Sequence, residues 1–194
     1  IHTHISVEYA SKDSLLAHLN RFSASESNGF KLNNISFNLG IGKKQSYISP
    51  IEVKLQNSKI NIEELSLTYD SLQQVFDTNS LKKHTKIKFS LNNSKIYGKD
   101  FKNFVPELKN LNKPFIANGR ITYYNNNVDL HGFQAKYGDN MVMKLSAGIN
   151  GLDRIEDTYI FANIQQISAN INELEDLISS IKQQPYIFPQ EIKK

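Results

Sequence analysis

The stretch Ile51-Glu-Val-Lys-Leu-Gln-Asn-Ser-Lys-Ile60 aligns without a gap with Ile87-Lys-Phe-Ser-Leu-Asn-Asn-Ser-Lys-Ile96, which lies 36 residues further along the chain. Both stretches alternate apolar and polar residues, the pattern of a β-strand with one apolar face. A looser third copy follows later in the chain. Together they give an approximate 36-residue repeat at 51–65, 87–101 and 160–178. This self-similarity predicts a mainly β chain assembled from related units.

The same alternation recurs outside the repeat, and turn-forming residues such as Asn125 to Asn127 separate the apolar runs. We expect about ten strands. One amphipathic helix is predicted near residues 171–183, with Asn170 and Glu173 placed as a capping pair. Residues 13–22 fit either a helix or an irregular strand, and the pattern leaves both open.

The composition excludes several classes of protein. The chain has 194 residues, enough for one domain or a short array of repeats. Its net charge of +4 is spread over scattered lysine doublets, which does not favour nucleic-acid binding. The absence of cysteine excludes disulfides, thiolate catalysis and cysteine-ligated zinc. No uncharged apolar run approaches the roughly 18 residues of a membrane-spanning helix.

No residue pattern indicates catalysis or a metal site. His2 and His4 share one face of a strand pattern, as do Asp129 and His131, but neither pair has a third ligand in reach. The neighbouring acids Glu63 and Glu64 point to opposite sides of a strand and cannot act together. We therefore expect a protein that is not an enzyme, with no cofactor, no metal and no nucleic-acid partner.

The apolar face of the strands is the strongest candidate for a functional surface. A closed β-sandwich would bury such faces against a second sheet, whereas an open repeating sheet would leave part of them as a trough. Alternation alone does not separate these two architectures.

A longer series of positions resembles a known family. The residues that carry the resemblance are Leu91-x-x-Ser94-x-Ile96, Asp100-Phe101, Phe104-Val-Pro-Glu-Leu108-x-x-Leu111, Gly119-x-Ile121, Gly151-Leu152-x-x-Ile155 and Asn172-x-Leu174-x-x-Leu177-Ile178. In this order they resemble the TamB proteins of Bacteroidetes, which belong to the AsmA-like superfamily, over roughly residues 20–194.

This resemblance implies a U-shaped repeating sheet, the β-taco. It makes residues 1–194 one segment of a longer, periplasmic chain, truncated at both ends, whose inner-membrane anchor lies outside the segment. Such proteins are viewed as bridges that guide phospholipid between the inner and outer membranes. The alternative is a structural scaffold that helps an Omp85-family barrel, through a region outside this fragment, in outer-membrane protein translocation and assembly.

Under the lipid-transfer interpretation, the alternating apolar side chains line a groove for acyl chains. Each methylene held in water costs about 0.8 kcal/mol, so a continuous apolar path lowers the barrier to moving a lipid. The predicted lipid contacts are Ile51, Val53, Leu55, Ile87, Phe89, Leu91, Phe115, Ile121, Tyr123, Met143, Leu145, Ile160 and Ile164. For each of them, packing in a closed core is the competing interpretation.

Overall fold

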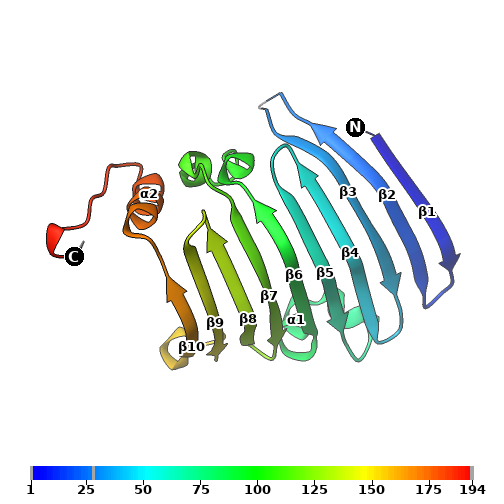
Figure 1. Cartoon of the computed structure of the whole chain (residues 1–194). Helices are drawn as coiled ribbons and strands as arrows, with labels where there is room; N and C mark the ends of the chain where they lie inside the picture. Colours follow the sequence, from blue (N-terminus) through cyan, green and yellow to red (C-terminus); the bar gives the residue numbers. More distant parts are fainter. Residues whose placement is uncertain (1, 28, 193–194) are drawn as a thin grey trace.

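In the part of the chain that the structure describes, ten antiparallel strands form a single open sheet in which the strand order follows the chain order (Figure 1). This computed structural model describes residues 2–27 and 29–192; residues 1, 28, 193 and 194 lie outside the described part. The strands are β1 (His2–Ala10), β2 (Leu15–Ser25), β3 (Lys31–Ile41), β4 (Gln45–Leu55), β5 (Lys59–Thr68), β6 (Lys86–Ile96), β7 (Phe115–Tyr124), β8 (Asn127–Tyr137), β9 (Met141–Asn150) and β10 (Tyr159–Ser168). The predicted mainly β class is confirmed.

Tight turns explain why consecutive strands pair. Asn125 and Asn126 both have positive φ, 48° and 59°, and join β7 to β8. A two-residue turn of this kind matches the right-handed twist of the flanking strands, and asparagine tolerates the left-handed conformation. Residues 13–22, which the sequence left open, contribute to strand β2 rather than to a helix.

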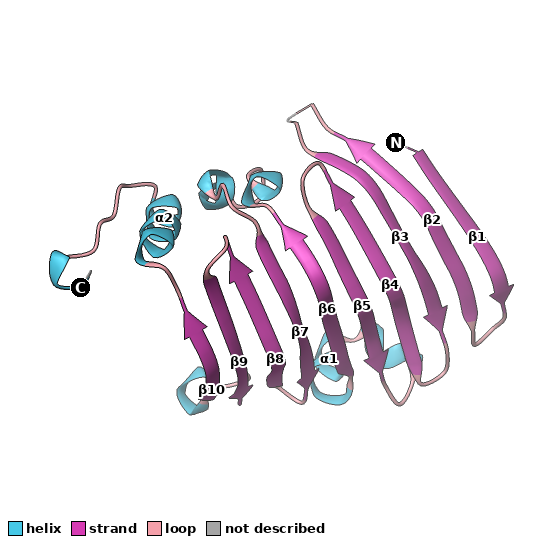
Figure 2. Ribbon diagram, in the orientation of Figure 1, coloured by secondary structure: helices cyan, strands magenta, loops and turns pink. Residues whose placement is uncertain are grey.

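The helices are small, and all except the one next to the C-terminus lie at the two rims of the sheet, where the strands end (Figure 2). The α-helices are α1 (Thr78–His84) and α2 (Ile171–Lys182), and short 3-10 helices span Leu72–Phe76, Gly98–Phe101, Pro106–Asn110, Ile155–Asp157 and Gln190–Ile192. Within residues 2–27 and 29–192, no second sheet packs against the first. The sheet is therefore a single layer.

The strand register places apolar side chains on one face across the whole sheet. Residues paired directly across neighbouring antiparallel strands share a face. From β5 to β10, one such row of successive partners is Leu65, Phe89, Ile121, Leu130, Ala147 and Ala162. The opposite face is polar; on it Lys54 and Lys59 lie 3.2 and 3.0 Å from a carboxylate oxygen of Glu52. We call these two surfaces the apolar face and the polar face.

The two closest copies of the repeat adopt different local structures. Residues 51–60 contain the end of β4, a turn and the start of β5, whereas residues 87–96 lie within the single strand β6. The difference is centred on the matching Asn-Ser pairs. Asn57 and Ser58 form the β4–β5 turn, while Asn93 takes a positive φ of 43° and widens β6 into a bulge.

Helix α2 begins where the sequence predicted, but its capping is different. The side chain of Asn170 accepts a hydrogen bond from the amide of Asn172 at 2.9 Å, which caps the helix. The expectation that Glu173 completes a capping pair is wrong. Its carboxylate accepts from the amides of Asp139 and Asn140, both at 3.0 Å, because the β8–β9 turn offers it two free donors. Glu173 thereby fixes α2 to the sheet.

Candidate apolar binding face

All thirteen predicted contact residues lie on the apolar face. They are Ile51, Val53 and Leu55 on β4, Ile87, Phe89 and Leu91 on β6, Phe115, Ile121 and Tyr123 on β7, Met143 and Leu145 on β9, and Ile160 and Ile164 on β10. Direct cross-strand pairs join some of them: Ile87 with Tyr123, Phe89 with Ile121, and Leu145 with Ile164. The β4 residues connect to the rest through Ile62 of β5, which pairs with both Ile51 and Leu91. The structure thus brings the predicted residues together on one surface.

Part of this surface lies outside the thirteen predicted residues. Additional apolar residues on the same face include Val7 on β1, Leu19 and Phe22 on β2, Phe37 on β3, Leu65 on β5, and Leu130 and Phe133 on β8. Most follow the same alternation. In β2 and β8, two residues instead of one separate consecutive apolar residues of this face. A search for strict alternation therefore misses the pattern there. A search that allowed one extra residue per strand would have recovered them.

A row of irregularities crosses the sheet near the middle of the strands. Every pairing except that of β4 with β5 contains at least one register shift. The shifts fall after Leu19 in β2, after Leu91 in β6, after Leu130 in β8 and after Ile164 in β10. A β-bulge bends its strand, so a row of bulges bends the sheet along one line. We call this line the bulge row; it divides the apolar face into two halves.

Side-chain hydrogen bonds hold the bulge row in place. Asn92 donates from Nδ2 to Oε1 of Glu63 at 2.6 Å, and the amide of Asn93 donates to Oδ1 of Asn118. Gly132 supplies a further bulge with a φ of 56°, a conformation that most side chains would strain. The second of these bonds satisfies a backbone amide within the bulge, and the first ties β6 to β5 beside it.

At its C-terminal end the apolar face runs beneath helix α2. A cavity of about 280 Å³ lies there, with an almost entirely apolar lining that includes Phe115, Met141, Met143, Ile167, Leu174 and Leu177. Two of the thirteen predicted residues, Phe115 and Met143, therefore line a hollow. The flexible methionine side chains can adapt to an apolar occupant of varied shape.

Tyr137 closes this cavity at the sheet. Its ring lies 4.8 Å from that of Phe115 and is 2% exposed, and its hydroxyl lies 3.5 Å from a carboxylate oxygen of Asp176 on α2. Burial, together with the negative charge of Asp176, raises the pKa of Tyr137 to about 12. The phenol therefore stays neutral at the edge of an apolar space.

The remaining chemistry of the described chain is sparse. Among residues 2–27 and 29–192, no three His, Asp or Glu side chains gather closely enough to hold a metal ion. The helices in that part of the chain are all too short or too polar to cross a bilayer. Comparisons of the chain with protein-family models, with curated proteins and with solved structures give no match.

Proposed function

We propose that this chain is a segment of a periplasm-spanning, bridge-like lipid transfer protein, which guides phospholipid acyl chains along its apolar face between the inner and outer membranes. One observation carries the proposal: the apolar face continues through all ten strands, and within the described residues no second layer covers it. The resemblance to TamB proteins supports the same function.

The physical argument concerns the cost of moving a lipid through water. A sixteen-carbon chain exposed to water carries a penalty on the order of 12 kcal/mol. Ten strands spaced about 4.8 Å apart provide roughly 45 Å of apolar track that lowers this penalty. Side chains on the track are still accessible, since Ile121 is 38% exposed and Ile164 is 57% exposed. Most of these contacts are aliphatic and similar to one another. We therefore expect no single position along the track to bind a lipid much more tightly than the others.

The proposal includes the finer shape, a U-shaped β-taco. The bulge row supports it, because a bend along that row would turn the two halves of the apolar face toward each other. In this shape the acyl chains lie between two walls. Helix α2 and its apolar residues Leu174 and Leu177 flank the trough at one rim and shield the cavity beneath.

A second candidate function is a scaffold that helps an Omp85-family barrel in outer-membrane protein translocation and assembly. The edge strands favour it, since β1 and β10 each pair on one side only in the described sheet. A free strand edge is a template for adding another strand. In that function the apolar face would serve packing rather than transport.

A crosslinking experiment separates the two functions. A benzophenone side chain replaces Phe89 on the apolar face or, as the matched control, its neighbour Lys88 on the polar face. The chain is irradiated in cells and analysed by mass spectrometry. The lipid-transfer proposal predicts phospholipid adducts from position 89 and few from position 88. A folded protein without adducts at position 89, or with barrel peptides in their place, contradicts it.

A charge placed on the track gives a quantitative test. Ile164→Asp adds a carboxylate on the apolar face of β10, and Asn163→Asp adds the same charge on the polar face one residue away. Both positions are exposed, so both variants should fold. We expect the affinity for a fluorescent phospholipid to fall roughly tenfold in Ile164→Asp, because burying an apolar contact of this size contributes about 1.5 kcal/mol. Equal losses in both variants would contradict a role for the apolar face.

A further inference from the structure

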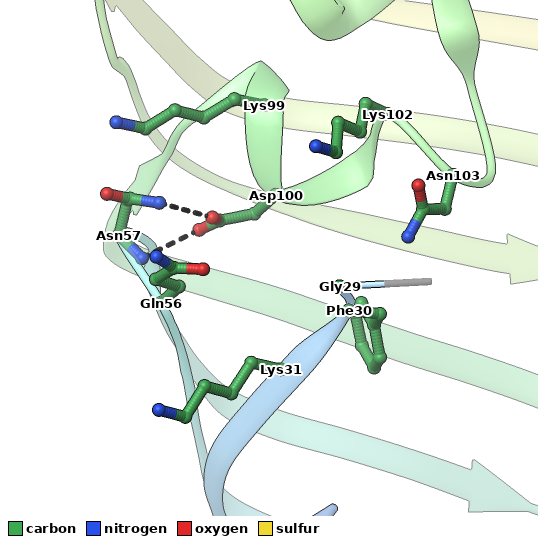
Figure 3. Close-up of a pocket in the computed structure, with 9 residues that line it drawn as sticks. All are labelled: Gly29, Phe30, Lys31, Gln56, Asn57, Lys99, Asp100, Lys102 and Asn103. Atoms are coloured by element: carbon green, nitrogen blue, oxygen red, sulfur yellow. Dashed lines mark hydrogen bonds between the residues drawn. The ribbon is translucent and has the colours of Figure 1, made fainter. Parts of the chain in front are cut away.

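A polar pocket lies at one rim of the sheet, where three connections meet (Figure 3). It is formed by the start of β3, the β4–β5 turn and the 3-10 helix Gly98–Phe101 with the residues after it. Its volume is about 190 Å³, several times the roughly 30 Å³ that one water molecule occupies in the liquid. The polar side chains around it include Lys31, Lys99, Lys102, Gln56, Asn57 and Asn103. We call it the rim pocket.

Asp100 holds the walls of the rim pocket together. Its carboxylate accepts four hydrogen bonds from two residues of the β4–β5 turn. The backbone amides of Asn57 and Ser58 donate at 3.0 and 2.7 Å, and their side chains donate at 2.6 Å each. These four donors saturate the carboxylate, so it is a structural anchor between two segments rather than a free ligand for a cation.

The three lysines leave the rim pocket with an excess of positive charge. In the described part of the chain, none of Lys31, Lys99 and Lys102 forms an ion pair. The ammonium nitrogen of Lys99 lies 5.3 Å from the centre of the Tyr97 ring, a cation–π contact. In Figure 3, Lys99 and Lys102 lie above Asp100 and Lys31 lies below it. Three ammonium groups against one saturated carboxylate favour a small anion.

The rim pocket adjoins the end of the apolar face. Lys31 directly precedes Leu32, and Gln56 directly follows Leu55; these two leucines are cross-strand partners. On β6 the outermost apolar residue of the face is Ile96, three residues before Lys99. An anion in the pocket is therefore within a few residues of the apolar track. A phospholipid combines an anion with attached acyl chains and so offers a partner for both surfaces.

We propose that the rim pocket binds the phosphate group of a phospholipid whose acyl chains lie on the apolar face. This inference rests on the proposed lipid-transfer function and adds a polar contact that orients the headgroup at the rim. Lys31, Lys99 and Lys102 supply the charge, and the amide groups of Gln56 and Asn103 offer further donors.

The test uses the whole chain and two soluble probes, inorganic phosphate and a dihexanoyl phosphatidylglycerol below its micelle concentration, titrated by calorimetry. The variant replaces Lys31, Lys99 and Lys102 by Gln. The matched control replaces Lys82, Lys83 and Lys86, three exposed lysines at the opposite rim, by Gln. Both variants lose the same charge. We expect the lipid to bind at least about tenfold more tightly than phosphate, and the pocket variant alone to weaken the binding of both by about tenfold.

Two results would overturn the inference. An equal loss in both variants shows general attraction to a basic protein, with no specific pocket. Equal affinities for phosphate and lipid show a site for a free anion, which removes the link to the apolar face. The outcome is independent of the crosslinking at position 89. Phospholipid adducts at that position with unchanged calorimetry in the pocket variant refute the rim pocket and leave the transfer function standing.

Discussion

Ile51 on β4 and Ile160 on β10 belong to the same face of the same sheet, yet their exposures are very different. Ile51 is 8% exposed, whereas Ile160 is 66% exposed. The side chains are identical, and each occupies an alternating apolar position. Local sequence therefore does not account for the difference; the position of the strand in the sheet does.

The comparison shows how a single-layer sheet is stabilised. With no second layer over the described strands, an apolar side chain is covered only by its neighbours along the sheet and across the bend. Ile51 has partners on both sides, Phe37 and Ile62, while Ile160 has a partner only on β9. Burial is accordingly concentrated in the central strands, and the end strands keep their apolar side chains exposed. We expect stability to reside in the centre and free binding surface to increase toward the ends.

The largest effect should come from truncating the two isoleucines in parallel. Ile51→Ala removes buried methyl and methylene groups and should lower the free energy of unfolding by about 2–4 kcal/mol. Ile160→Ala removes the same atoms from an exposed position and should change it by less than about 0.5 kcal/mol. Urea denaturation followed by circular dichroism measures both. Similar losses in the two variants would show that the end strands are covered in solution, for instance by self-association.

A smaller effect is expected at Asp100, which secures the central β4–β5 turn. Burial is the strongest influence on its pKa and raises it, but the hydrogen bonds from Ser58 and Asn57 outweigh burial and hold the pKa below the ordinary value of 3.8. The stabilisation that results is fully present at a pH above the pKa of Asp100 in the unfolded chain. It is lost as the pH falls through the lower pKa of Asp100 in the folded chain. Asp100→Asn should lower the free energy of unfolding by about 1–2 kcal/mol at pH 7. The NH₂ group of the new side chain is itself a donor, so it faces other donors and cannot accept their hydrogen bonds.

The pH dependence provides the control for this variant. As the pH falls from about 4 through the lower pKa of the folded state, the wild-type carboxyl takes up a proton and loses its charge-assisted hydrogen bonds, so the stability difference between wild type and Asp100→Asn should shrink over that range. Denaturation midpoints measured from pH 7 down to pH 2 test this. A difference that stays constant with pH would mean that the charge of Asp100 does not hold the turn, and that the centre of the sheet needs no such anchor.

The sequence predicted the fold class because alternation is a local property of each strand. The run from Ile87 to Leu91 shows period two whether or not the next strand is known, and Asn125–Asn126 indicates a tight turn from its own conformational preference. Residues 13–22 were ambiguous because Asn20 and Arg21 together face one residue of β3, which breaks the alternation. The decision between helix and strand there depends on a partner strand, not on the segment itself.

The candidate site was predictable in part for the same reason. Each of the thirteen residues could be placed on an apolar face from its own strand, but sequence could not tell whether a second sheet covers that face. The rim pocket was missed entirely. Its lysines lie far apart in the chain, at positions 31 and 99. They come together because β3 pairs with β4 and because Asp100 ties the β4–β5 turn to the segment after β6. A contact of this range leaves no periodic signal.

The smallest effect concerns Tyr137, near the C-terminal end of the sheet, where α2 covers the apolar face in addition to the neighbouring strands. Burial and the charge of Asp176 raise its pKa from 10.0 to about 12, so the unfolded chain loses this proton before the folded one. Stability should therefore fall as the pH rises from 10 toward 12. Tyr137→Phe should remove most of this dependence and leave stability near neutral pH almost unchanged, since the hydroxyl contact of 3.5 Å is long and weak. Unfolding midpoints between pH 9 and pH 11 test this prediction. If the variant loses as much stability with rising pH as the wild type does, α2 leaves this end of the face as open to water as β10.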